Sequence, residues 1–261
     1  MDLRLRDKVI IVTGGASGIG EGICRKLAEE GAIPCILDRD EQNTLRVFSE
    51  LSREYGIMPF YHLMDLTDPA ACNEAVARVL GELGRIDGLV NNAGLNDGVG
   101  LANGTYEKFV GSLDRNVGHY FSVASATLPA LKLSFGAIVN ICSKTAITGQ
   151  GGTSGYAAAN GERLTLTKEW AAELQKYGIR VNAVVVAECM TPQYRWWIGQ
   201  QADPEAKLRE IVSKIPLENR MTTAEEIANM AAMLLSPASA AVNGQLLHVD
   251  GGYVVLDRAA S

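Results

Sequence analysis

The sequence predicts an α/β protein built on one doubly wound parallel sheet with helices on both faces. Three observations predict this class. Short apolar strands alternate with helical segments almost to the C-terminus, a glycine-rich turn follows the first strand, and no linker or repeat interrupts the 261 residues. Continuous apolar strands are typical of parallel sheets, because helical crossovers bury both faces. We therefore expect one domain over residues 1–261.

The first unit runs from a strand through a helix to a second strand. Residues 9–12 form an apolar, β-branched run, and a glycine-rich turn over residues 13–20 follows it. Apolar residues at helical spacing continue to Gly31, where a helix can stop. A second strand over residues 34–37 then ends at Asp38. A unit of about 30 residues in this order is a βαβ crossover.

The alternation continues in the same way along the rest of the chain. Helices are predicted over residues 40–55, 69–83, 106–131, 156–177 and 224–235. Strands are predicted over residues 60–63, 88–90, 137–141, 180–184 and 245–249. The pattern lapses only over about residues 187–216, which hold one charged helical piece. Such an excursion in a compact domain is typical of a lid or binding loop, so we expect it to cover the site.

Composition excludes several classes of function. The chain has 24 Lys and Arg against 30 Asp and Glu, a net charge of -6, whereas binding to nucleic acid needs a basic face. The five cysteines include no C-x-x-C pair and the three histidines lack metal-ligand spacing, so we expect no disulfide framework and no metal site. No apolar run reaches about 18 residues and no signal-peptide core is present. We expect a cytoplasmic protein without a membrane or nucleic-acid partner.

The glycine-rich turn is the first candidate site. Gly14, Gly18 and Gly20 lie between a strand and a helix, where glycine lets the backbone approach a pyrophosphate and the helix start favours negative charge. An isolated match fits an ordinary turn equally well. Asp38, at the end of the second strand, favours a Rossmann-type dinucleotide site, because its carboxylate can bind an adenosine ribose and repels a 2′-phosphate. This indicates NAD, and Arg39 beside it leaves NADP open.

Further motifs occur in a fixed order along the chain. They are Asp65-Leu66, Asn91-Asn92-Ala93-Gly94, Asn116, Ser143, Tyr156, Arg180-Val181-Asn182 and Asp250-Gly251-Gly252. Together with the Thr-Gly-x-x-x-Gly-x-Gly spacing at residues 13–20, this order resembles the short-chain dehydrogenase/reductase family over essentially the whole length. The resemblance implies an NAD(P)-dependent oxidoreductase that acts on CH-OH groups. It also implies a homotetramer, with the helices over residues 106–131 and 156–177 and the C-terminal strand at its interfaces.

The resemblance also implies roles for individual residues. The cofactor would be held by Gly14, Ser17, Gly18, Ile19, Gly20, Asp38, Arg39, Asp65, Leu66, Asn92, Ala93, Gly94, Tyr156, Asn160, Met190 and Thr191. Ser143 would hydrogen-bond the reacting oxygen, and Tyr156 would exchange its proton as general acid/base. Asn116 would support a proton-carrying water.

The sequence departs from the family at position 160. The family has a lysine there, four residues after the tyrosine, whose ammonium stabilises the phenolate, but this chain has Asn160. Loss of a nearby charge commonly moves a pKa by about one to three units, each worth roughly tenfold. Lys168, two helical turns further on, is a poor substitute. We therefore expect severely reduced turnover, either in a natural relative with altered proton chemistry or in a point variant of an active enzyme; the retained Ser143 and Tyr156 favour the point variant.

Several residues are expected to face the substrate. Glu188 would accept hydrogen bonds from hydroxyl groups, although a solvated loop acid is an equal alternative. Other residues expected at the substrate are Asn96, Thr145, Gln150, Thr153, Gln193, Tyr194, Arg195, Trp196 and Trp197. Polar groups around an aromatic platform suit a sugar ring, while one of the two tryptophans is expected only to pack.

The segment over residues 187–197 is similar to that of bacterial L-fucose (threo-aldose) dehydrogenases. This similarity implies oxidation of L-fucose or a related aldose to its lactone. Two alternatives remain open. One is a dehydrogenase of another hydroxy compound, such as a keto-deoxy sugar acid or a 3-oxoacyl substrate. The other is a catalytically silent, NAD-binding sensor or scaffold.

Overall fold

A seven-stranded parallel sheet forms the centre of the computed structural model, which describes residues 2–256. Its strands lie in the order β3-β2-β1-β4-β5-β6-β7. Their bounds are β1 (Val9–Thr13), β2 (Ile33–Asp38), β3 (Phe60–Leu63), β4 (Gly88–Asn91), β5 (Ala137–Ser143), β6 (Arg180–Val186) and β7 (Leu246–Val249). The order reverses between β1 and β4, which is where doubly wound sheets bind their ligands. The predicted fold class is confirmed; residues 1 and 257–261 of the predicted domain lie outside the described residues.

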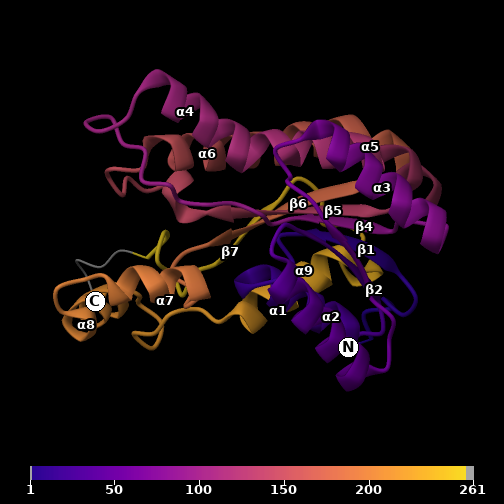
Figure 1. The fold of residues 1–261 in the computed structure, drawn as a ribbon, viewed down its shortest axis with the longest axis horizontal. Helices are drawn as coiled ribbons and strands as arrows, with labels where there is room; N and C mark the ends of the chain where they lie inside the picture. The colour runs from indigo at the N-terminus through magenta and orange to yellow at the C-terminus, as the bar shows by residue number, and fades with distance from the viewer. Residues whose placement is uncertain (1, 257–261) are drawn as a thin grey trace.

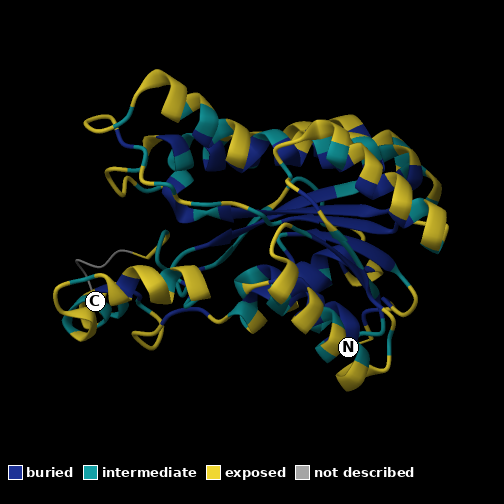
Figure 2. Ribbon diagram, viewed as in Figure 1, coloured by how far each residue is buried: buried dark blue, intermediate teal, exposed yellow. Residues whose placement is uncertain are grey.

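Helices cover both faces of the sheet (Figure 1). One layer contains α3 (Pro69–Leu83), α4 (Tyr106–Leu113), α5 (His119–Ser134) and α6 (Ser154–Leu174). The other contains α1 (Gly18–Glu29), α2 (Glu41–Tyr55) and α9 (Ala224–Leu235). Ile10 and Val12 of β1 pack into the cluster with α1 and α9, whereas Val9 and Ile11 pack into the cluster with α3 and α5. The strand is therefore buried on both sides, as Figure 2 shows for the centre of the sheet.

Local patterns predicted most elements closely, and two segments differ. β3, α3 and α9 have the predicted bounds. The helix predicted over residues 106–131 is instead divided into α4 and α5 by a π-helical turn over Asp114–Gly118. Asn116 in this turn accepts a hydrogen bond from Leu95, which lies 21 residues earlier, and π-turns are frequent at functional sites.

The second difference is the segment over residues 187–216, which contains two helices instead of one. Both α7 (Pro192–Gly199) and α8 (Pro204–Val212) begin with proline after a capping residue. The capping side chains of Thr191 and Asp203 accept backbone hydrogen bonds and thereby start each helix. The two helices share an apolar cluster of their own around Ile198 and lie off one end of the sheet (Figure 1).

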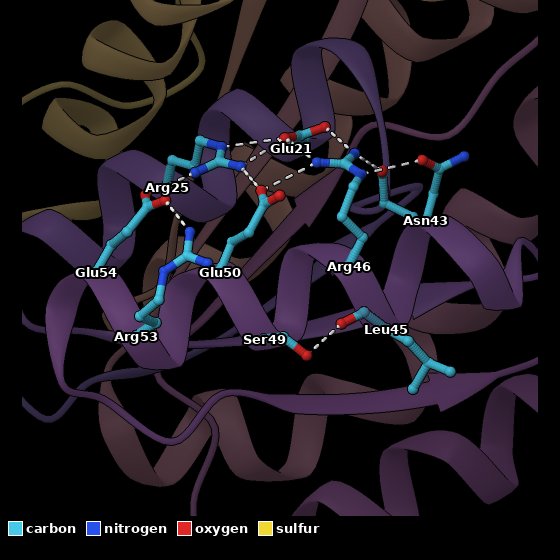
Figure 3. A network of polar contacts seen from close by, with 10 residues as sticks. Glu21, Arg25, Asn43, Leu45, Arg46, Ser49, Glu50, Arg53 and Glu54 are labelled. Atoms are coloured by element: carbon cyan, nitrogen blue, oxygen red, sulfur yellow. Dashed lines mark hydrogen bonds and ion pairs between the residues drawn. The ribbon is translucent and has the colours of Figure 1, made fainter.

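Ion pairs join α1 to α2 beside the glycine-rich turn (Figure 3). Glu21 accepts hydrogen bonds from Arg25 and Arg46, and both arginines also pair with Glu50. Burial opposes ionisation of Glu21, but Arg46 and Arg25 outweigh it and lower the pKa of this carboxyl. Arg46 also lies 3.5 Å from the carbonyl oxygen of Ala16. The network therefore holds α2 against the turn that precedes α1.

Membrane insertion through a helix finds no support in residues 2–256: none of their helices combines the length and apolarity that a crossing requires.

Candidate active site

The turn between β1 and α1 is shaped by glycines that no other residue could replace without strain. Gly14 and Gly18 have φ values of +65° and +56°, in the left-handed region that favours glycine. A Cβ atom on Gly20 would lie 1.9 Å from the carbonyl oxygen of Gly14. The Asn92 amide, after β4, donates to the carbonyl oxygens of Thr13 at 3.0 Å and Gly14 at 3.1 Å. The turn and the end of β4 thus form one unit.

The helix that follows this turn begins without a side-chain cap. Ser17 is the N-cap of α1, but its side chain accepts no hydrogen bond from the helix, in contrast to Asp40 at α2. The first N–H groups of α1 are therefore open to an anion. Thr191, at the start of α7, lies over the same turn, since a Cβ atom on Gly18 would be 3.2 Å from its side chain.

Asp38 lies beside the turn at the end of β2. Its carboxylate accepts a hydrogen bond from the Ala16 N–H at 3.1 Å and further bonds from two backbone N–H groups that follow it. Asp65, after β3, accepts from the N–H of Thr67 at 2.9 Å, and this bond lowers the pKa of the Asp65 carboxyl. The glycine cradle, the open helix start and the two carboxylates fit an adenine dinucleotide.

The remaining predicted cofactor residues lie in the same region of the fold. Ile19 is in the first turn of α1, and Leu66 follows β3. Ala93 and Gly94 follow β4; the Ala93 N–H donates to the Thr13 hydroxyl at 3.2 Å. Arg39 follows Asp38, and Met190 precedes α7. All of them follow the carboxyl ends of strands, so the topology brings them to one edge of the sheet.

Ser143, Tyr156 and Asn160 are brought together by β5 and α6. The Ser143 N–H donates to the Asn160 side-chain oxygen at 2.8 Å, and the Asn160 amide donates to the carbonyl oxygen of Tyr156 at 2.9 Å. The Ser143 hydroxyl accepts from the Thr145 N–H at 3.2 Å. Ser143 and Tyr156 are half-buried, whereas Asn160 is fully buried. The Ser143 and Tyr156 side chains can therefore reach a bound molecule, whereas the Asn160 side chain is enclosed within the protein.

Asn116 lies within the π-helical turn and is fully buried. Its side-chain oxygen accepts from the Leu95 N–H at 2.7 Å, and its amide donates to the carbonyl oxygens of Leu95 and Ser112, both at 3.0 Å. The side chain therefore anchors the loop after β4 to the turn after α4. The predicted support of a water by Asn116 stays a prediction.

A family model described as enoyl-(acyl carrier protein) reductase matches residues 14–254. The chain belongs to the short-chain dehydrogenase/reductase family. It is therefore an oxidoreductase that acts on hydroxyl or keto groups of small molecules with NAD or NADP.

Individual relatives differ in their substrates. The chain is 34% identical over 254 residues to the 3-oxoacyl-(acyl-carrier-protein) reductase FabG of Thermotoga maritima, covering 97% of this chain and 100% of that protein. It is 32% identical over 261 residues to the L-fucose dehydrogenase of Bos taurus, covering 100% and 94%. The crystal structure of Cj0485 dehydrogenase is similar with a TM-score of 0.94 and 41% identity, covering 99% and 98%.

Lys144 is a site residue of this short-chain dehydrogenase/reductase that sequence reasoning missed. It follows Ser143 directly, is 6% exposed, and forms an ion pair with Glu188. Its Nζ lies 3.8 Å from the ring centroid of Tyr253. Glu188 also hydrogen-bonds Tyr194, and burial together with Glu188 raises the pKa of that tyrosine. Glu188 is therefore not a solvated loop acid.

Arg163 is the second missed residue. It lies three residues after Asn160 on α6, is 2% exposed, and donates to the Asn160 side-chain oxygen at 3.2 Å. Its position one turn beyond Asn160 was the available signal, because residues three or four apart share a helix face. The sequence prediction considered Lys168 on this helix and not Arg163.

The predicted substrate residues divide by exposure. Glu188, Tyr194 and Thr153 are half-buried, and Thr145 is buried with a hydroxyl that has no hydrogen-bond partner among the described residues. Exposed residues are Asn96, Gln150, Gln193, Arg195, Trp196 and Trp197. Trp197 packs edge-on against Tyr194 with ring centroids 5.4 Å apart, while Trp196 is 67% exposed. The structure thus encloses the first set at least partly and leaves the second at the surface.

Proposed function

We propose that the protein oxidises a sugar hydroxyl, that of L-fucose or a related aldose, to the lactone with NAD or NADP. The observation that carries this proposal is the Lys144–Glu188 pair beside Ser143. The charged pair, together with the Tyr194 hydroxyl that hydrogen-bonds Glu188, supplies hydrogen-bond donors and acceptors to a polyol. An acyl chain or a steroid would instead need an apolar wall. The similarity to L-fucose dehydrogenase supports the same substrate class.

In the proposed mechanism, Ser143 holds the reacting oxygen by a hydrogen bond and Tyr156 accepts the hydroxyl proton. The cofactor, when bound, accepts the hydride. Asn160 is neutral and cannot itself stabilise the phenolate that this role requires. We therefore expect lower turnover than in a relative with lysine at this position.

Asp38 underlies the proposed preference for NAD. Its carboxylate lies beside the glycine turn and would accept hydrogen bonds from a ribose, while it would repel a 2′-phosphate. The exposed Arg39 keeps NADP possible. The ratio of kcat/KM for the two cofactors decides the preference.

The segment over residues 187–216 is proposed to close over the substrate as a lid. Thr191 already lies against Gly18, and α7 carries Tyr194 toward Glu188. We also propose a homotetramer, supported by exposed apolar side chains on α4 and α5 such as Tyr106 and Phe121. Sedimentation equilibrium measures the assembly state directly.

The experiment that tests this function is a substrate screen. The protein is incubated with NAD or NADP and with L-fucose, other aldoses, a keto-deoxy sugar acid or a 3-hydroxyacyl thioester, and NAD(P)H formation is followed at its absorbance. Activity highest on aldoses supports the proposal. Activity confined to the thioester favours the 3-oxoacyl alternative, which the likeness to FabG makes worth testing. Tight NADH binding without turnover of any compound favours the silent sensor or scaffold that Asn160 suggests.

A further inference from the structure

Arg163 is a buried cation on the helix face that carries Tyr156 and Asn160. The three residues occupy positions i, i+4 and i+7 of α6 and therefore lie along one face. Arg163 is 2% exposed, and within residues 2–256 it forms no ion pair with an acidic side chain. Burying a charge is costly unless it is well hydrogen-bonded, so its partners must be specific.

Backbone carbonyl groups surround the Arg163 guanidinium. Its Nε donates to the carbonyl oxygen of Asn116 at 2.9 Å, and Nη2 approaches the same oxygen closely. Nη2 also donates to the carbonyl oxygen of Ala93, and Nη1 to that of Ile141, both at 3.2 Å. These acceptors come from the end of β4, from β5 and from the π-turn. The positive charge is thus held by dipoles and is not cancelled by a carboxylate.

Among residues 2–256, Asn160 is the one side chain that accepts a hydrogen bond from Arg163. Its oxygen accepts from the Ser143 N–H and from Nη1 of Arg163, while its amide donates to the carbonyl oxygen of Tyr156. A lysine at position 160 has three donors and no acceptor. It would leave the Ser143 N–H without a partner and place an ammonium beside the guanidinium. A neutral acceptor at 160 therefore suits the buried cation at 163, whereas a lysine at 160 would not.

We propose that Arg163 carries the positive charge that a lysine at position 160 carries elsewhere in the family, with Asn160 as its obligatory neutral partner. This inference rests on the proposed function. Arg163 is a positioning residue that acts through Asn160, whose amide donates to the backbone carbonyl oxygen of Tyr156. Because arginine stays protonated, it supplies charge and rigidity but relays no proton.

The same contacts change the route of the proton. Two N–H groups of Arg163 occupy the carbonyl oxygen of Asn116, which has two lone pairs. Both lone pairs of that oxygen are then taken, so a water that Asn116 supports cannot bind at that oxygen. The proton that Tyr156 takes from the substrate hydroxyl therefore leaves to solvent, which its half-buried side chain can reach.

A double-mutant cycle tests the pair. Arg163→Leu, Asn160→Lys and the combined variant are compared with the unmodified protein for kcat, KM and unfolding temperature. We expect each single substitution to lower kcat tenfold or more with KM for the sugar changed less than threefold. The combined variant should regain or exceed the unmodified kcat, because the lysine then lacks a like-charged neighbour. Arg163→Lys should retain more of kcat than Arg163→Leu.

Arg180→Leu is the matched control, because Arg180 is another partly buried arginine whose guanidinium donates to carbonyl oxygens at the end of α9, away from the site. It should lower the unfolding temperature and leave kcat within twofold. A rise in kcat for Asn160→Lys alone, equal to that of the combined variant, overturns the inference, as does an unchanged kcat in Arg163→Leu.

The unfolding temperatures separate this inference from the proposed function. If no variant turns over any substrate, the proposed function fails, and the contribution of Arg163 to turnover fails with it. The coupling of the two residues is still decided, because losses that add in the combined variant refute the pair, whereas recovery of the unfolding temperature supports it.

Discussion

Replacing Gly20 with alanine should distort the glycine-rich turn and weaken cofactor binding. The added Cβ would lie 1.9 Å from the carbonyl oxygen of Gly14, whereas ordinary contact begins at 3.4 Å, so that oxygen must retreat by about 1.5 Å (3.4 − 1.9). This movement breaks the 3.1 Å hydrogen bond from the Asn92 amide. Overpacking of this kind typically costs about 1–3 kcal/mol of stability. A displaced turn also misaligns the open N–H groups of α1.

NADH fluorescence titration and thermal unfolding measure the two effects. We expect the NADH Kd of Gly20→Ala to rise at least tenfold, about 1.4 kcal/mol, and the Tm to fall by roughly 2–4 °C for each kcal/mol lost. Gly81→Ala on α3 is the matched control, because a Cβ there has no atom within 4 Å. It should stabilise the helix by about 0.5–1 kcal/mol. An unchanged Kd in Gly20→Ala would refute the argument from close approach.

Three other predictions concern the substrate pair, the cofactor and acid stability. Lys144→Met leaves the Glu188 carboxylate without its lysine partner at a site where its side chain is 14% exposed. We expect the free energy of unfolding, measured in urea, to fall by about 3–5 kcal/mol. The double variant Lys144→Met/Glu188→Gln should lose less, and equal losses in the two variants would contradict the pairing. Asp38→Ser removes the charge facing a 2′-phosphate, and the ratio of kcat/KM for NADP to that for NAD should rise at least tenfold; no change would exclude this carboxylate from cofactor choice. The hydrogen bond from Arg220 lowers the pKa of Glu226 from 4.5 to about 2, so its stabilisation is complete above about pH 4.5 and is lost as the pH falls toward 2. Because both side chains are more than a third exposed, Glu226→Gln should cost about 1 kcal/mol or less at pH 7 and still less at pH 3; a cost that grows on acidification would contradict the sign.

The pairing of Asn160 with Arg163 also bears on the origin of Asn160. The retained Ser143 and Tyr156 favoured a point variant, because a drifted protein has little reason to keep them. A point variant, however, would not bring its own buried cation with a hydrogen bond to the new side chain. The contact therefore favours Asn160 as the natural partner of Arg163.

The sheet and its order of elements followed from local patterns. Residues 9–12 are apolar at every position, which requires burial on both faces, and the bounds of α3 and α9 are marked by capping residues next to an apolar period. The glycines of the cofactor turn were equally clear, because their spacing between a strand and a helix has few other uses. The π-turn was not predictable, since Asn116 bonds Leu95, which lies 21 residues earlier.

The chain's own order of residues predicted a dinucleotide-binding oxidoreductase and singled out Ser143 and Tyr156 as candidate site residues, because those features lie in short, contiguous motifs. The sequence did not indicate which charged side chains lie near these two residues. Lys144 and Glu188 are 44 residues apart and meet only because β5 and β6 pair in parallel, with Ser143 beside Val186. Arg163 finds its partners on β5, after β4 and in the π-turn, none of which lies near it in sequence. Charges act through space, so the electrostatics of this site exist only once the sheet has assembled.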